Sequence, residues 1–146
     1  MLVNHVMKVL SLLQPWATLV VKGVKKIETR SWRTAYRGEL LIHASSGKKG
    51  GILVTESPFE KYIPNFSSLP FSAIIGKVIL NAVVPVEQLH LSDGHLNALT
   101  LEEKAFGDYT KGRYAWLLSE PVEFKKPVST GGALGLWEYS SDELEE

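Results

Sequence analysis

The longest strand candidate of the chain, residues 73–84 (AIIGKVILNAVV), places the strongest constraint on the fold. Apolar side chains fall on both faces of this segment when it is extended, which is typical of a strand covered on both sides. Gly76 lies inside the segment, at a point where a strand can bend or form a bulge. The sequence therefore predicts a central strand here, and a mainly β fold around it.

Shorter segments with strand periodicity surround this one. In residues 26–30 and 38–44, successive side chains fall on opposite faces with a period of two residues. A polar turn separates the two segments, so they predict a hairpin. Further extended segments are expected at residues 8–13, 113–118, 122–124 and 135–139. In the segment 113–118, Trp116 lies on the apolar face and is expected in the core.

Three short helices are expected in the connections. Residues 14–23 (QPWATLVVKG) predict the first, with Pro15 in its first turn and Gly23 just past its end. The patterns Ser57-Pro-Phe-Glu and Thr100-Leu-Glu-Glu predict capping boxes that begin two more, and Gly107 follows the second of these. Together the elements indicate an α+β, mainly β fold: a small mixed barrel of five to six strands with short peripheral helices.

Length and composition narrow the classes of protein. A chain of 146 residues is expected to form one domain, residues 7–140, followed by an acidic and disordered tail at residues 141–146. Absence of cysteine excludes disulfides, thiolate metal sites and a cysteine nucleophile, and the four scattered histidines suggest no metal site. We expect no metal, no cofactor, no membrane span and a cytoplasmic location.

Charge is distributed unevenly along the chain. Residues 1–50 carry a balance of +7, and the remaining residues carry −7. This asymmetry indicates a local anion-binding face. The segment Gly23–Trp32 (GVKKIETRSW) concentrates this charge beside an indole.

Three side chains of this segment, Lys25, Glu28 and Arg30, are expected to share one cleft. Lys25 and Glu28 are three residues apart, and an extended strand would place them on opposite faces. To share a cleft with Glu28, Lys25 must belong to the turn after the helix rather than to the strand. Arg30 and Lys25 would then contact a phosphate or a base edge. Glu28 would orient the two cations or accept a hydrogen bond from a base amino group. The alternative is a solvated strand face with ordinary ion pairs.

The remaining candidates form the surroundings of this cleft. An indole from Trp16 or Trp32 would supply a stacking surface for a base, although Trp16 also fits a core position. Further cations are expected to contribute to ligand binding, two of them on a flexible basic loop at residues 45–51: Lys26, Arg37, Lys48 and Lys49. His43 fits either a general base or a hydrogen-bonded structural residue.

The spacing Gly23-x-Lys25-x-x-Glu28-x-Arg30 resembles the G-x-K-x-x-E-x-R signature of ASCH domains, which are similar to PUA domains. Flanking segments extend the resemblance over nearly the whole chain from residue 7: Gln14-Pro-Trp16-Ala, Trp32, Arg37-Gly38, Trp116-Leu, Glu120-Pro121, Phe124, Pro127 and Gly-Leu-Trp137. The resemblance implies a PUA-like barrel. ASCH domains are proposed to bind RNA, some resemble ribonucleases, and one subgroup hydrolyses an acetylated cytidine nucleoside.

Three functions follow from the resemblance and the residues. The first is a domain that binds RNA or a nucleotide-like ligand in the charged cleft. The second is a hydrolase acting on RNA or an acylated cytidine, a ribonuclease or nucleoside amidohydrolase with Lys25 and Glu28 as catalytic residues. In the cytidine-hydrolysing subgroup a threonine stands where this chain has Glu28, so that mechanism does not transfer unchanged. The third is a protein-interaction module of the coactivator type, with residues 64–71 as its contact surface.

Overall fold

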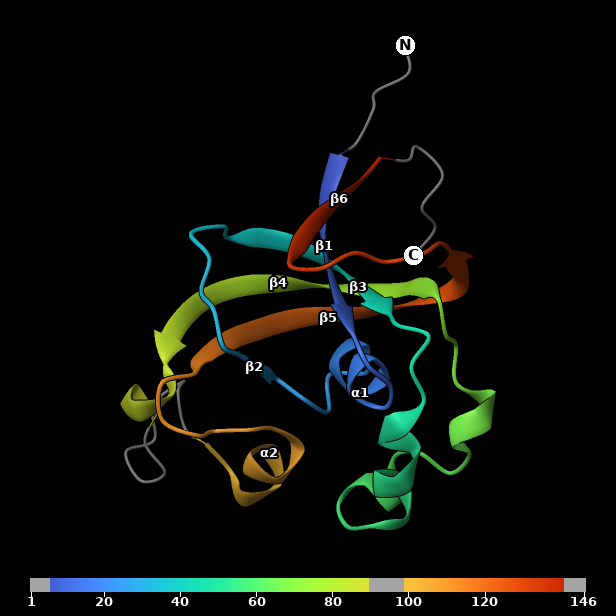
Figure 1. The fold of residues 1–146 in the computed structure, drawn as a ribbon, viewed down its shortest axis with the longest axis horizontal. Helices are drawn as coiled ribbons and strands as arrows, with labels where there is room; N and C mark the ends of the chain where they lie inside the picture. Colours follow the sequence, from blue (N-terminus) through green and yellow to red (C-terminus); the bar gives the residue numbers. More distant parts are fainter. Residues whose placement is uncertain (1–5, 90–98, 141–146) are drawn as a thin grey trace.

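The computed structural model describes residues 6–89 and 99–140. Six strands and short helices follow one another along the chain (Figure 1). They are β1 (Val6–Leu12), α1 (Trp16–Val21), β2 (Ile27–Arg30), β3 (Gly38–Ala44), the 3-10 helices η1 (Lys49–Thr55), η2 (Phe59–Lys61) and η3 (Phe66–Ser68), β4 (Ala73–Pro85), η4 (Val86–Gln88), α2 (Leu101–Phe106), β5 (Tyr114–Ser129) and β6 (Leu136–Ser140). The expected α+β, mainly β architecture with short helices is confirmed.

The six strands form one mixed sheet in the order β2-β5-β4-β3-β1-β6. Strands β1 and β3 are parallel, and the other neighbouring pairs are antiparallel. The two longest strands, β4 and β5, run alongside each other through the middle of the molecule (Figure 1). β2 and β6 are the edges of this order, so the sheet has a barrel-like fold without a hydrogen-bonded closure in the described part.

The hairpin predicted for residues 26–30 and 38–44 is wrong. β2 pairs with β5, placing Glu28 opposite Trp116, while β3 pairs with β4 and β1. Alternation determines which face each side chain occupies, but it does not determine the partner strand. The connection from Ser31 to Arg37 therefore links strands that lie three places apart in the sheet.

Strand β4 is central and buried on both faces, as predicted. Ile75, Val78 and Leu80 belong to the core that also contains Val20 and Trp116, whereas Ile74 belongs to a second cluster on the other face. Trp116 is fully buried, so its predicted core position is confirmed.

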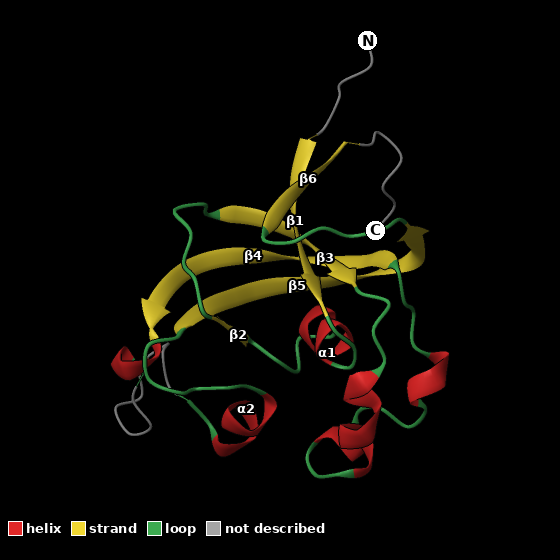
Figure 2. Cartoon of the chain, viewed as in Figure 1, coloured by secondary structure: helices red, strands yellow, loops and turns green. Residues whose placement is uncertain are grey.

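Gly76 marks a bulge, because the register between β4 and β5 shifts between Ile74 and Gly76. A Cβ at Gly76 would lie 2.3 Å from the carbonyl oxygen of Val122 and 2.6 Å from Cγ1 of Val21. The glycine therefore lets α1 approach the sheet closely. In Figure 2 the helices lie on one side of β4 and β5, and α1 is drawn beneath the middle of these strands.

The predicted caps have mixed outcomes. Thr100 Oγ1 accepts from the Glu103 amide at 3.0 Å, so the first half of its capping box is present. At the other predicted box, Pro58 precedes η2 and no side chain caps it. The predicted basic loop at residues 45–51 is replaced by η1 from Lys49 onward. Gly50 packs so closely against the carbonyl oxygen of Gln14 that a side chain there would collide with it. The predicted tail, residues 141–146, lies outside the described residues.

Candidate functional site

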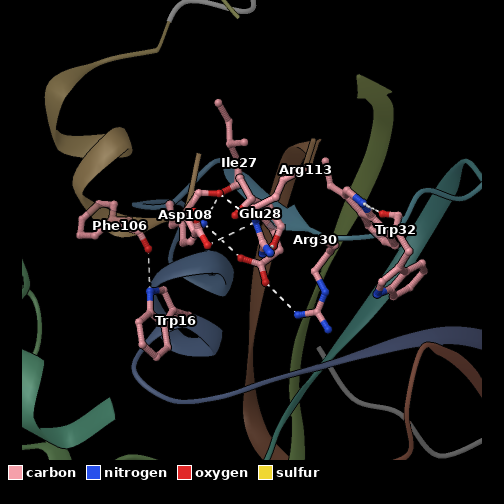
Figure 3. A network of polar contacts seen from close by, with 11 residues as sticks. Trp16, Ile27, Glu28, Arg30, Trp32, Phe106, Asp108 and Arg113 are labelled. Carbon is pink, nitrogen blue, oxygen red and sulfur yellow. Dashed lines mark hydrogen bonds and ion pairs between the residues drawn. The ribbon is translucent and has the colours of Figure 1, made fainter. Parts of the chain in front are cut away.

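An open cleft of about 610 Å³ lies between the start of α1, strand β2 and the segment that follows α2. Its polar and aromatic lining comes from segments far apart in sequence, and includes Trp16, Glu28, Arg30, Phe106, Asp108 and Arg113. Figure 3 shows Glu28, Asp108 and Arg113 close together, with Arg30 on one side and Trp16 of α1 on the other. The cleft therefore combines cations, carboxylates and aromatic rings within one hollow.

Glu28 is the centre of the charged cluster. Its Oε1 lies 3.2 Å from Nζ of Lys25, and its Oε2 lies 3.1 Å from a terminal guanidinium nitrogen of Arg30 (Figure 3). Only 10% of the Glu28 side chain is exposed. One carboxylate thus serves two cations, and the cluster retains one positive charge.

Lys25 reaches Glu28 from inside the protein. Its side chain is 0% exposed, and its ammonium also donates to the carbonyl oxygen of Ile27. Lys25 does not line the 610 Å³ cleft, whereas Glu28 and Arg30 do. The structure therefore brings the three predicted residues together, but Lys25 lies behind the carboxylate rather than on the cleft surface.

The turn after α1 places Lys25 on the inner side. The amides of Val24 and Lys25 both donate to the carbonyl oxygen of Leu19 at 3.0 Å. Gly23 has a φ of +76°, a left-handed conformation that glycine adopts without steric cost. This turn, rather than the strand, carries Lys25 to the same side as Glu28, as the odd spacing of the two residues requires.

Arg30 occupies the cleft surface. Its side chain is 28% exposed, and its guanidinium carbon lies 5.8 Å from the centre of the Trp32 ring. Trp32 in turn meets Trp116 edge to face, with ring centroids 4.9 Å apart. A cation held between a carboxylate and an indole keeps part of its donor fork available to a ligand.

Trp16 is partly packed in the protein interior and partly exposed on the cleft. Its ring packs edge to face on Phe59 at 6.1 Å, and its indole Nε1 donates to the carbonyl oxygen of Phe106 at 2.6 Å (Figure 3). The half-buried ring also lines the cleft. These contacts fix the orientation of an aromatic wall opposite Arg30.

Arg113 is a site residue that the sequence did not reveal. It donates to the carbonyl oxygen of Thr29 at 3.0 Å and to that of Asp108 at 3.0 Å, and it lies 3.7 Å from the Asp108 carboxylate. The pairing of β2 with β5 places it beside β2, because Arg30 is opposite Tyr114. The mistaken hairpin concealed this neighbourhood.

The other predicted cations lie outside this cleft. Arg37 is exposed and donates to the carbonyl oxygens of Thr34 and Tyr36. Lys48 lies 5.0 Å from the ring centre of Phe71, and Lys49 is exposed at the start of η1. The side chain of Lys26 is exposed as well. The basic balance of the first 50 residues is therefore spread over several surfaces.

A buried acidic group lies behind the motif and was also missed. Glu103 of α2 accepts from the backbone amide of Lys26 at 2.7 Å, instead of closing its own capping box. Burial raises the pKa of Glu103, and the hydrogen bond from the Lys26 amide and the charge of nearby Lys25 oppose this shift. Burial likewise raises the pKa of Tyr109. Among the described residues, neither Glu103 Oε2 nor the Tyr109 hydroxyl has a hydrogen-bond partner.

His43 is a structural histidine, as one of its two interpretations predicted. Its Nδ1 lies 3.0 Å from Oγ of Ser11, and its Nε2 lies 2.8 Å from the carbonyl oxygen of Thr130. Trp137 Nε1 donates to the same serine at 3.0 Å. The tautomer with its proton on Nε2 satisfies every contact in this chain, so the ring links β3 to the loop before β6.

The apolar segment 64–71 contains the short helix η3 and packs against the protein with part of its side chains. The rings of Phe66 and Phe71 meet at 5.5 Å, and Phe66 and Leu69 pack against the cluster that contains Leu19.

Within residues 6–89 and 99–140, no three His, Cys, Asp or Glu side chains are grouped so that they could hold a metal ion. No helix in the described part has the length and apolarity that a membrane span requires.

Two curated proteins share a short segment with this chain. Activating signal cointegrator 1 of Homo sapiens is 49% identical over 47 residues, which are 32% of this chain and 8% of that protein. The Mus musculus protein of the same name is 55% identical over 40 residues, which are 27% of this chain and 7% of that protein. The match therefore spans a small part of each relative's length.

Solved structures and a family model match a larger part of this chain than the two curated proteins do. The crystal structure of ASCH from Zymomonas mobilis has 23% identity and a TM-score of 0.48, covering 84% of this chain and 73% of that one. A mutant of the same protein has 22% identity and a TM-score of 0.49, covering 84% and 75%. The ASCH domain model matches residues 10–128. Because that match covers most of the sequence, the chain belongs to the ASCH domain family.

Proposed function

We propose that the cleft containing Glu28 and Arg30 binds a single-stranded RNA segment or a nucleotide-like ligand. A volume of about 610 Å³ suits a ligand of nucleotide size. The proposal depends most on Arg30, which lines the cleft with 28% of its side chain exposed while Glu28 orients its guanidinium at 3.1 Å. An arginine fixed in this way offers a planar pair of donors to a phosphate.

The neighbouring groups suit the other parts of a nucleotide. Trp16 offers an aromatic wall on which a base can stack, and stacking of this kind does not depend on base identity. Arg113 adds a second guanidinium, 27% exposed, on the same cleft. Glu28, Glu56 and Asp108 line the same cleft as Arg30 and Arg113, so attraction of an anion depends on the exposed guanidinium of Arg30 rather than on the charge of the whole cleft.

The test compares Arg30→Ala with Arg37→Ala in binding of fluorescent single-stranded RNA oligonucleotides. Arg37 is a matched control because it is an exposed arginine outside the cleft. We expect Arg30→Ala to weaken binding about tenfold and to lower the salt slope by about 0.7, the value for one lost phosphate contact on a single strand. Arg37→Ala should stay within about twofold of the wild type. Equal losses in the two variants would contradict the proposal.

A hydrolase acting on RNA or an acylated cytidine is the second candidate. The 3.2 Å ion pair between Lys25 and Glu28 favours it, because a lysine and a carboxylate can exchange protons in general acid–base catalysis. Glu28 would be the group that meets the substrate, since it lines the cleft and Lys25 does not. Turnover of RNA or N4-acetylcytidine that disappears in Glu28→Gln would support this candidate, and absence of turnover in the wild type would reject it.

A protein-interaction module is the third candidate, and the name of the cointegrator relatives supports it. This function would leave the charges of the cleft dispensable. Binding of a protein partner that is unchanged by Arg30→Ala, together with no measurable affinity for RNA, would favour it over the first proposal.

A further inference from the structure

A second cleft of about 420 Å³ lies next to the first one. Both clefts are lined by Ser11, Arg30 and Ser45, so they share a border. The far wall of the second cleft belongs to the loop 131–135, and Ser46, Ser72 and His43 complete the lining. Arg30 is the one charged side chain on the shared border, and it can therefore serve both hollows.

The second cleft has a different chemistry from the first. Serine hydroxyls and the backbone of a glycine-rich loop line it together with His43, Ala133 and Leu134, and no indole is part of its lining in the described residues. Hydroxyl and backbone groups suit the hydroxyls of a sugar and the oxygens of a phosphate, whereas an indole suits a base. The indole of Trp16 therefore lies in the first cleft, and the hydroxyls of Ser46 and Ser72 lie in the second.

The floor of the second cleft is held in place by the histidine network. A Cβ at Gly132 would lie 2.6 Å from Cε1 of His43 and 2.6 Å from Oγ of Ser11, so only a glycine allows the loop to approach so closely. His43 also bonds the carbonyl oxygen of Thr130 at 2.8 Å, and the Thr130 amide donates to the carbonyl oxygen of Ser72 at 3.0 Å. Ser72 itself has a φ of +53°, a conformation that serine rarely adopts. The loop is therefore positioned by several contacts, as a preformed binding wall requires.

We propose that the ligand is an RNA segment of at least two nucleotides, bound across both clefts. One base lies against Trp16 in the first cleft, the linking phosphate lies at Arg30, and the adjoining ribose lies in the second cleft. This inference depends on the proposed function, and it adds to that function a minimum ligand length and a second binding region.

The test measures affinity for a nucleoside monophosphate, a diribonucleotide and a hexaribonucleotide by calorimetry. We expect the diribonucleotide to bind at least about tenfold more tightly than the monophosphate, because the second contact becomes intramolecular. Ser46→Trp, an exposed position on the second cleft, should remove this gain and leave the affinity for the monophosphate unchanged. Ser68→Trp is the matched control, since Ser68 is exposed and lines neither cleft. Ala133→Trp fills the second cleft from the opposite wall and should act like Ser46→Trp.

Two results would overturn the inference. Equal affinities for the monophosphate and the diribonucleotide would show that the second cleft contributes nothing, while the proposed function would stand. A diribonucleotide gain that survives both filling variants would place the second nucleotide elsewhere. Failure of the wild type to bind any of the three ligands would instead reject the proposed function, and this inference with it.

Discussion

Lys25 and Arg30 belong to one basic segment and pair with the same carboxylate, yet their surroundings are opposite. The Lys25 side chain is 0% exposed and bonds Ile27 as well as Glu28. The Arg30 side chain is 28% exposed and lies over an indole at the cleft. Removing one partner of a buried ion pair leaves a desolvated charge behind, whereas an exposed pair contributes little to stability. Lys25 therefore holds Glu28 in place, and Arg30 is the cation available to a ligand.

The largest expected effect is that of Lys25→Met on stability. Methionine keeps much of the apolar stem but leaves Glu28 without its buried cation, so the free energy of unfolding should fall by about 3 kcal/mol. Urea denaturation measures this change. Lys26→Met is the matched control, because the Lys26 side chain is exposed, and it should change stability by less than about 0.5 kcal/mol. Similar losses of unfolding free energy in the two variants would contradict the structural role of the buried Lys25.

The turn that directs Lys25 inward can be tested at Gly23. Alanine there must adopt a φ of +76°, and its Cβ would lie 2.8 Å from Cγ of Pro121. We expect Gly23→Ala to lower the free energy of unfolding by about 1–2 kcal/mol. Gly131→Ala is the control, since nothing lies within 4 Å of its Cβ position. Thermal denaturation of both variants provides the measurement, and an unchanged midpoint for Gly23→Ala would show that the turn tolerates a side chain.

Much of the fold could be predicted from local pattern, and the errors concern distant partners. Periodicity identified the central strand β4 and the short helix after Gln14, because burial and capping leave local signatures. Pairing of β2 with β5 joins residues nearly ninety positions apart, and no local pattern encodes it. Arg113 was missed for the same reason.

Burial of Lys25 lies beyond what spacing can reveal. The sequence supported convergence of three charged side chains, because the odd step from Lys25 to Glu28 is informative. Whether a lysine then faces solvent depends on what covers it. Here Glu103 of α2 accepts from the Lys26 amide, which brings a helix from distant sequence over the motif. Only the tertiary structure supplies that information.

The pH dependence of stability tests the burial of the Glu103 carboxyl group behind the motif. The raised pKa of Glu103 means that the folded protein binds this proton more tightly than the unfolded chain. Stability should therefore fall as pH rises from about 4.5, the ordinary value, to the raised pKa, and should then level off. Glu103→Gln keeps an oxygen for the Lys26 amide and removes the titration, so its stability relative to the wild type should rise over that window. Urea midpoints at several pH values measure the difference, and parallel curves would contradict the assignment.

The smallest expected effect is that of Arg30→Ala on stability. Because solvent screens Arg30 and Lys25 still pairs with Glu28, the free energy of unfolding should change by less than about 1 kcal/mol. The same variant is expected to lose RNA affinity, so stability and binding should separate at Arg30. Urea denaturation of Arg30→Ala beside Lys25→Met gives the comparison. A loss as large as that of Lys25→Met would mean that the fold needs both cations beside Glu28, and that Arg30 belongs to the structural pair. A small loss would leave its guanidinium free to be used by a ligand.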